Sequence, residues 1–327
     1  MWNNRDVSRL QVLLAAFCFG TTGTAQALGP DASSVTVGAA RIAVGALLLL
    51  AAEWAMTRRR ARIRVTSRTH VVHEVTRNPE GGARGWSVRP LAIGAVGVAT
   101  YQLCFFAAVK DTGVAVGTVV ALGSAPALAG LGGWLLDRRL PDRAWAIATA
   151  LACAGVATLA LGGGGGDVSA AGVALAVGAG ASYAAFTLAS KRLLDQGHQV
   201  EPVMARLFGF GALLLSPVLV LGDVAWLATA GGAAMALWLG AVPTAIAYIL
   251  FASGLRHLPA NEVATLTLAE PVTAALLGAV VLGERPGATA LGGIVMILAG
   301  LAVLAAPRKR RPRAVPTSTA EAPAAPA

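Results

Sequence analysis

Glu270 is the side chain in this sequence with the clearest potential for chemistry. It lies inside an apolar run, directly before Pro271, where a charged carboxylate is costly and normally faces a cavity or a partner. Apolar surroundings disfavour the charged form, which would suit reversible proton binding. Pro271 removes a backbone donor and leaves an upstream carbonyl free to face a solute path. The alternative is a structural role, in which Glu270 pairs with a buried donor such as Arg41.

Arg41 is the only basic residue that falls well inside an apolar run. A guanidinium in that position can bind a substrate carboxylate through two parallel hydrogen bonds. It can equally hold the helices together by pairing with a helix C-terminus or with a carboxylate. Glu262 stands near the start of the run that contains Glu270, and we expect it in the headgroup layer.

Polar and aromatic residues interrupt several other apolar runs and are candidates for lining a cavity. Thr244 and Tyr248 are one turn apart, as are Thr267 and Glu270, so each pair shares one side of a helix. Each of these residues could instead stabilise helix–helix packing, through interhelical hydrogen bonds or contacts. The predicted cavity set is Thr21, Thr24, Tyr101, Gln102, Ser124, Tyr183, Thr244, Tyr248, Thr267 and Glu270, with helix breaks at Pro126 and Pro271.

These residues need a scaffold, and composition indicates that lipid surrounds it. The chain has 327 residues, of which 56% are apolar and 13% charged, and its mean hydropathy is +0.68. So few charged residues cannot cover a soluble protein of this size. A bilayer-spanning helix needs roughly 20 apolar residues, and the chain holds ten such runs. The predicted spans are 9–28, 34–55, 90–110, 113–136, 143–161, 170–190, 203–221, 226–251, 260–282 and 288–306.

The basic residues predict an orientation in the membrane. The net charge of +10 could suggest a nucleic-acid partner, but these residues cluster between the apolar runs. With the N-terminus in the cytoplasm, only Lys110 and Arg285 lie outside and only Arg41 lies within a span. The positive-inside rule therefore predicts cytoplasmic N- and C-termini in a bacterial inner membrane, and no nucleic-acid partner. The basic loop 57–89 is a topology signal or a contact for anionic lipid.

The chain divides into two halves around a glycine-rich segment. We expect a first repeat over 1–161, a linker over 162–169, a second repeat over 170–306 and a disordered cytoplasmic tail over 307–327. Each half holds five spans, and an odd number forces the second copy to insert upside down. The predicted fold is therefore an all-α integral membrane protein with ten transmembrane helices in two inverted five-helix repeats.

The segment from Thr244 to Arg285 carries a resemblance to a known family. It contains Leu255-Arg-His-Leu-Pro-Ala260, then Leu268-Ala-Glu-Pro-Val272, then Leu282-Gly-Glu-Arg285. This succession resembles the second repeat of EamA-type transporters of the drug/metabolite transporter superfamily, and the likeness extends over about residues 10 to 306. The first half departs from the family pattern, since Asp137 stands near the position of the usual glutamate. The resemblance implies ten helices in two inverted repeats around a central cavity.

The resemblance also implies a function. Such proteins mostly export amino acids, related metabolites or toxic compounds, and some take solutes up. We therefore predict a secondary transporter that exports an amino acid or related small metabolite by alternating access, with proton coupling through Glu270 as a hypothesis. An uptake permease or a multidrug exporter is the alternative, and an integral membrane enzyme is a distant one, because the sequence has no Gly-x-Ser-x-Gly or His-Glu-x-x-His motif.

The expected partners follow from this assignment. We expect a small-molecule substrate and membrane lipid, and a chain that acts as a monomer or a homodimer. We expect no enzymatic activity and no cofactor. We expect no metal either, because the three cysteines fit no metal-ligand spacing; they are Cys18, Cys104 and Cys153.

Overall fold

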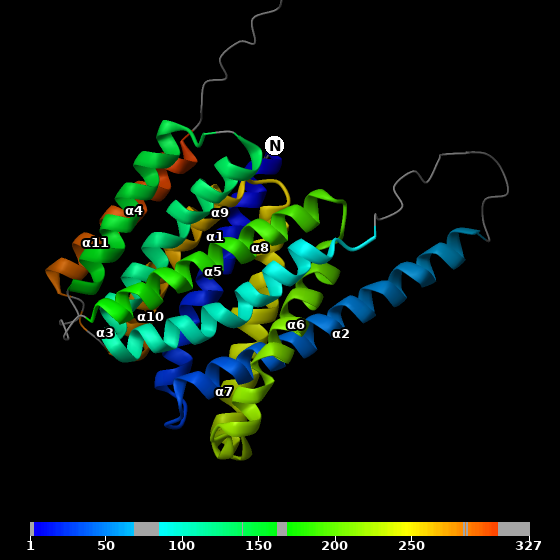
Figure 1. Ribbon diagram of the computed structural model, residues 1–327, viewed down its shortest axis with the longest axis horizontal. Helices are drawn as coiled ribbons and strands as arrows, with labels where there is room; N and C mark the ends of the chain where they lie inside the picture. Colours follow the sequence, from blue (N-terminus) through cyan, green and yellow to red (C-terminus); the bar gives the residue numbers. More distant parts are fainter. Residues whose placement is uncertain are drawn as a thin grey trace, which may run out of the picture.

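The computed structural model describes residues 3–68, 85–138, 140–161, 169–283, 285 and 287–306, and the regular structure within those ranges is helical. Figure 1 shows one bundle, with α4 and α11 side by side at one edge and α2 reaching past its neighbours. The α-helices are α1 (Asn4–Ala27), α2 (Ser34–Arg68), α3 (Val88–Asp137), α4 (Arg143–Leu161), α5 (Ala170–Asp195), α6 (Val200–Leu221), α7 (Ala230–Gly240), α8 (Ala247–Leu255), α9 (Ala260–Leu266), α10 (Glu270–Val281) and α11 (Ala288–Ala305). Three other turns join them: the 3-10 turns η1 (Ala225–Ala228) and η3 (Thr267–Ala269), and the π-helical turn η2 (Ala241–Ile246).

Length and apolar composition make most of these helices membrane spans. A helix of 26 residues is about 39 Å long, which exceeds the roughly 30 Å of a bilayer's hydrocarbon core. Within the described chain, α1 is not among the ranges that meet this requirement, and α4 is apolar over the shorter range Arg143–Thr158. The protein is therefore an all-helical, multi-pass membrane protein, and the total of ten spans stays a prediction. The eight ranges that are long and apolar enough are Ser34–Arg59, Val88–Gly113, Val116–Leu136, Ala170–Asp195, Val200–Leu221, Ala230–Leu255, Ala260–Val281 and Ala288–Ala305.

The α-helical backbone is interrupted at three places. Gly113 divides α3 with φ 80° and ψ 160°, a conformation with positive φ that glycine adopts without a side-chain clash. The π-helical turn η2 separates α7 from α8, and there the Thr244 hydroxyl donates to the Leu239 carbonyl over 2.8 Å. The turn η3 separates α9 from α10, which begins with Glu270 and Pro271. Two apolar spans are thus broken in their interior.

Small residues let the helices approach closely. α5 packs along α3, α4 along α11, α2 along α6, and α1 against α8 and α10. Between α4 and α11, a Cβ atom added to Gly155 would lie 2.7 Å from the Gly293 carbonyl oxygen, and one added to Gly300 would lie 2.6 Å from the Ala148 carbonyl oxygen. Glycine at these positions therefore brings the two backbones together, as is common between helices in lipid.

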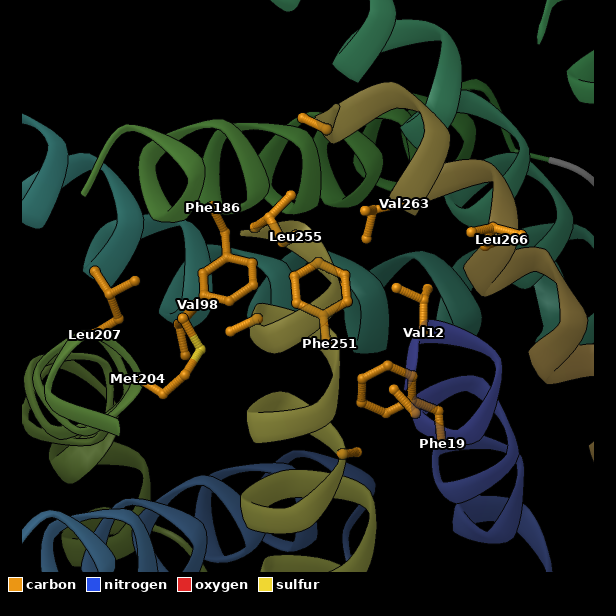
Figure 2. Close-up of a cluster of buried hydrophobic side chains, with 14 of the residues drawn as sticks. Val12, Phe19, Val98, Phe186, Met204, Leu207, Phe251, Leu255, Val263 and Leu266 are labelled. Carbon is orange, nitrogen blue, oxygen red and sulfur yellow. The ribbon is translucent and has the colours of Figure 1, made fainter. Parts of the chain in front are cut away.

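The main apolar core draws on α1, α2, α3, α5, α6, α8 and α9, and Figure 2 shows part of it. Phe186 of α5 stacks on Phe251 of α8 with ring centroids 6.1 Å apart. Val12 and Phe19 of α1 belong to the same cluster (Figure 2). This core fixes the relative positions of the helices that surround the site described below.

Two segments differ from the sequence-based expectation. We expected residues 57–89 to form a loop, but α2 continues as a helix to Arg68, and α3 begins at Val88. Arginine has a high helix propensity, so the helix extends beyond the apolar run. The eighth span was expected from residue 226, whereas a 3-10 turn covers residues 225–228 and α7 begins at Ala230.

Two further expectations concern segments that the structure hardly describes. The tail 307–327 and residues 162–168 of the expected linker lie outside the described residues. Ser169, the last residue of that linker, is the N-cap of α5, and its hydroxyl accepts from the Gly172 amide over 2.9 Å.

Candidate functional site

A small cavity lies in the centre of the bundle between the helices of both halves. Its volume is about 40 Å³, and a still smaller space of about 10 Å³ adjoins it beside Gln102. We refer to it as the central cavity. Of the residues that line it, Arg41 and Glu270 are charged. The lining residues are Phe19, Thr22, Arg41, Tyr101, Leu122, Ala125, Tyr183, Tyr248, Ala264, Thr267, Leu268 and Glu270.

Glu270 reaches the cavity from the first turn of α10. The 3-10 turn η3 lies directly before it in the same span. Within the described chain the Glu270 carboxylate makes no hydrogen bond and no ion pair shorter than 4.0 Å. The carboxylate is therefore available to a proton or to a cationic group of a solute.

Arg41 reaches the same cavity from α2. With the Gln102 amide oriented so that its oxygen faces the guanidinium, that oxygen accepts from Arg41 Nε over 3.0 Å and from Nη2 over 3.2 Å. This pair of bonds orients the guanidinium toward the cavity, where Arg41 and Glu270 attract each other without forming an ion pair. The site thus offers an anion-binding and a cation-binding group in one small space.

Tyr101, Tyr183 and Tyr248 form an aromatic wall of the cavity that holds the two charges. Tyr248 of α8 lies 4.9 Å from Phe19 and 4.4 Å from Phe208, measured between ring centroids. The Tyr183 hydroxyl of α5 donates to Thr267 Oγ1 over 3.3 Å, which links α5 to the turn η3. These rings give the cavity an apolar surface with a few hydroxyl groups, a common composition of small-molecule sites.

The central cavity is too small for a solute in this conformation. A volume of about 40 Å³ holds only a few water molecules, since each needs about 10–15 Å³. Pockets that bind small ligands measure roughly 300–1,000 Å³. A solute can therefore occupy this site only after the surrounding helices move apart.

Two larger openings lie toward opposite ends of the bundle. The first, of about 430 Å³, we call the Trp145 crevice; the second, of about 510 Å³, we call the Trp238 groove. The Trp145 crevice is lined by Arg5, Gly130, Gly133, Trp134, Leu140, Pro141, Asp142, Trp145, Leu188, Lys191, Pro259, Ala260, Asn261, Glu262 and Leu304. The Trp238 groove is lined by Thr21, Thr24, Ala25, Leu28, Gly29, Gly231, Ala234, Met235, Trp238, Leu277 and Val281.

The short helix α9 lies between the Trp145 crevice and the central cavity. The Trp145 indole donates to the Asn261 carbonyl over 3.1 Å and to Thr265 Oγ1 over 3.0 Å. Thr149 of α4 also bonds Thr265, with 2.8 Å between the two hydroxyl oxygens. Side chains of α4 thus hold α9 in the position that closes the cavity on this side.

Comparison with known proteins places this arrangement in a family. The profile of the EamA-like transporter family matches residues 8–161 and 170–306. The chain belongs to the EamA-like transporter family. The uncharacterized transporter YwfM of Bacillus subtilis (strain 168) is 39% identical over 308 residues, which cover 94% of this chain and 96% of YwfM. The uncharacterized transporter YxxF of the same organism is 33% identical over 126 residues, or 38% of this chain and 40% of YxxF.

A solved structure supports the fold of this EamA-like transporter. One crystal structure superposes with a TM-score of 0.73 at 20% identity, covering 90% of this chain and 95% of the other. At that identity the likeness speaks for the fold alone. Together with the family match, it confirms the resemblance to the drug/metabolite transporter superfamily inferred from the motifs between Thr244 and Arg285.

The structure of this EamA-like transporter brings seven of the predicted residues together. They come from α2, α3, α5, α8, η3 and α10. Only η3 and α10 are consecutive in the sequence, so the fold brings the other elements together. The seven residues at the central cavity or the space beside it are Arg41, Tyr101, Gln102, Tyr183, Tyr248, Thr267 and Glu270.

Four other predicted residues do not line the central cavity. Thr21 and Thr24 line the Trp238 groove instead. Ser124 donates to the Ala121 carbonyl over 3.2 Å, and Thr244 is buried in η2 with its hydroxyl bonded to the main chain. Hydroxyls that bond the preceding turn are a usual feature of membrane helices.

The structure also shows where the two predicted helix-break prolines lie, and it identifies site residues that the sequence did not indicate. The expected helix break at Pro126 is not found, because α3 is helical through Pro126 and its non-helical residue is Gly113. Pro271 lies at the start of α10 beside the cavity. Thr22 and Phe19 line the central cavity although the sequence singled out Thr21 and Thr24. Glu262 is not merely a headgroup residue, because it forms ion pairs with Arg9 and Arg5. Its spacing from these arginines in the sequence carries no signal for that contact.

Proposed function

We propose that this EamA-like protein is a secondary transporter that binds an amino acid or related small metabolite in the central cavity and exports it. The observation that carries the proposal is the pair of opposite charges, Arg41 and Glu270, in one aromatic-lined cavity. An amino acid carries a carboxylate that suits the guanidinium and an ammonium group that suits the carboxylate. The tyrosines between them would contact the rest of the solute.

The proposed scaffold is ten spans in two inverted repeats, and the contacts between α4 and α11 support it. Gly155 of α4 contacts the backbone of α11, and Gly300 of α11 contacts the backbone of α4 in the reciprocal way, as a two-fold axis requires. The same number of residues separates the two members of each related pair in these contacts, and it also separates Pro126 from Pro271. The related pairs are Pro126 with Pro271, Ala148 with Gly293, Ala152 with Ile297, and Gly155 with Gly300.

Packing elsewhere in the bundle supports the same symmetry. α1 of the first half packs on α8 and α10 of the second, and α5 of the second half packs on both parts of α3 in the first. Gly20 of α1 lies against Thr273 of α10, while Gly180 of α5 lies against Ser124 in the second part of α3. Each half thus inserts its first helix into the other, with the two proline-containing segments in corresponding places.

Alternating access would open the central cavity to one side at a time. The small cavity and the Trp145 crevice beyond α9 are consistent with a conformation between the two open ones. Opening toward the crevice would require α9 to move, and the break at η3 beside Pro271 supplies a place for that movement. In the proposed orientation the termini and the crevice face the cytoplasm of a bacterial inner membrane.

Proton coupling through Glu270 is the finer part of the proposal. Its carboxylate faces a small, largely apolar cavity and has no ion-pair partner within 4.0 Å among the described residues. Such surroundings disfavour the charged form, so proton binding and solute binding would compete for the same group. Efflux driven by an inward proton gradient follows if Glu270 binds a proton when the solute leaves.

The test is overproduction of the wild type, Glu270→Gln and Arg41→Gln in an efflux-sensitive bacterium, with released metabolites measured by mass spectrometry. We expect one amino acid or related metabolite to rise at least tenfold in the medium with the wild type alone. Glu201→Gln, a carboxylate variant in the first turn of α6 that does not line the cavity, serves as the control and should export normally.

Other outcomes would change the proposal in defined ways. Equal release by the wild type and both cavity variants would show that neither Arg41 nor Glu270 is needed to bind the solute. Normal transport by Glu270→Gln over the whole pH range would remove proton coupling while keeping the transporter. Depletion of a solute from the medium by the wild type would reverse the direction and identify an uptake permease.

A further inference from the structure

The Trp238 groove has the dimensions of a ligand site but a different chemistry from the central cavity. Its volume of about 510 Å³ falls in the range of pockets that hold small ligands. The end of α1, the start of α7 and the end of α10 form its walls. None of the residues that line it is charged. A zwitterion or a phosphate would therefore find no counter-charge here.

Two of the three side chains with polar groups in the groove, Trp238 and Thr21, are already bonded, and the third is Thr24. The Trp238 indole donates to Thr21 Oγ1 over 3.3 Å, and the Thr21 hydroxyl donates to the Cys18 carbonyl over 2.7 Å. Both groups thus satisfy each other or the main chain, and the remaining wall consists of side chains such as Leu28, Met235 and Leu277. This wall favours a hydrocarbon over a ligand that needs hydrogen bonds.

The groove is continuous with the lipid-facing surface of the protein. Leu28 at one end is 68% exposed, and Val280 beside the lining residue Val281 is 82% exposed. Gly231 and Ala234 of α7 are also exposed. Exposed apolar side chains on membrane helices face acyl chains, so the solvent at the mouth of this groove is lipid.

We propose that the Trp238 groove is a lateral binding site for one acyl chain of a membrane phospholipid. The groove also borders the transport site, because Thr21 lines the groove while the next residue, Thr22, lines the central cavity. An acyl chain held here would contact the turn of α1 that closes the cavity. The site itself does not depend on the proposed transport function, and the test below measures binding rather than transport.

The test uses a phospholipid with a diazirine near the end of one acyl chain, reconstituted with the purified protein in nanodiscs. After illumination, adducts are mapped on peptides by mass spectrometry. We expect adducts to concentrate on the groove segments of α1, α7 and α10, at least fivefold above the exposed face of α6, where Leu213 and Val220 also face lipid.

Substitutions that fill the groove should remove these adducts. Gly231 lines the groove, and a Cβ added to it has Pro30 Cδ as its nearest neighbour, at the ordinary contact distance of 3.8 Å, so Gly231→Leu is the variant chosen to fill the groove. We expect at least a fivefold loss of adducts in Gly231→Leu and in Ala234→Phe. Gly23→Leu is the matched control, because this exposed glycine of α1 has no atom within 4 Å of an added Cβ and does not line the groove.

Two results would overturn the proposal. Equal adducts on α6 and on the groove, unchanged in Gly231→Leu, would mean that only bulk lipid passes over this surface. Labelling of Ala234→Cys by a membrane-impermeant maleimide, in a chain whose three native cysteines are replaced by alanine, would mean that water fills the groove. A melting temperature of Gly231→Leu close to that of Gly23→Leu will show that lost adducts reflect a filled groove and not an unfolded chain.

Discussion

Arg9 Nε donates to Glu262 Oε1 over 2.8 Å and so joins the first turns of α1 to the start of α9. Arg9 also donates to the Ala305 carbonyl at the end of α11, over 3.2 Å, and Arg5 reaches the other oxygen of Glu262 over 3.2 Å. The Arg9 guanidinium thus joins α1, α9 and α11 at the edge of the Trp145 crevice. The side chain of Glu262 is 4% exposed, that of Arg9 14% and that of Arg5 51%.

The two arginines should differ in their contribution to stability. Arg9→Ala leaves a buried carboxylate with one solvent-exposed partner and should lower the free energy of unfolding by about 3 kcal/mol. Arg5→Ala removes a half-exposed pair and should cost less than about 1 kcal/mol. Melting temperatures in detergent measure the difference, and added salt should weaken only the Arg5 contribution. An equal loss in both variants would contradict the asymmetry.

Gln102 should matter to transport although it bears no charge. Gln102→Leu removes the acceptor that orients Arg41, so the guanidinium can turn away from the central cavity. If the proposed function holds, we expect at least a tenfold loss of export with little change in melting temperature. Gln26→Leu, at the end of α1 and away from the central cavity, should export normally. Full export by Gln102→Leu would show that Arg41 needs no such support.

The helices could be predicted from the sequence because each span has to be a continuous apolar run. The charged residues of the site stood out for the same reason, since Arg41 and Glu270 are exceptions within such runs. Their meeting in one cavity could not be predicted, because they lie on α2 and α10 and no spacing rule relates these helices. The same holds for Tyr101, Tyr183 and Tyr248, which come from three different helices.

Two differences between the sequence-based expectation and the structure have identifiable physical causes. Thr21 and Thr22 are adjacent in the sequence, and which of them faces the cavity depends on how α1 is rotated against α10. Gly20, which packs on Thr273, fixes that rotation, and the contact is visible only in the fold. The extension of α2 to Arg68 was missed because hydropathy marks the end of a span and not the end of a helix.

The reciprocal contacts between α4 and α11 predict matched effects of two substitutions. Gly155→Leu and Gly300→Leu each drive a side chain into the backbone of the other helix, which should cost about 1–3 kcal/mol by overpacking. The two losses should be similar, because the proposed two-fold axis would make the sites equivalent. Gly292→Leu on α11 meets no atom within 4 Å of its Cβ and should leave the melting temperature unchanged. Unequal losses would count against the inverted-repeat symmetry.

A stacked cluster at the ends of α5 and α6 should make stability depend on pH. The centroid of the Trp86 ring lies 4.0 Å from that of the His198 ring and 4.2 Å from the Arg206 guanidinium carbon, and Arg206 pairs with Glu53 over 2.7 Å. Loss of hydration, and then the charge of Arg206, lower the pKa of His198 below its usual value. Its Nε2 is buried without a hydrogen-bond partner among the described residues.

The sign of the effect follows from the lowered pKa. Between that value and the usual one near 6.5, the unfolded chain binds a proton on this histidine and the folded chain does not. Above about pH 6.5, His198 is neutral in both the folded and the unfolded chain and does not lower the free energy of unfolding. As the pH falls below that value, the free energy of unfolding decreases. His198→Phe keeps the stacking on Trp86 and removes the titration. Melting temperatures at pH 7.5 and pH 5.5 should fall further in the wild type than in His198→Phe, and equal falls would assign the acid sensitivity to other groups.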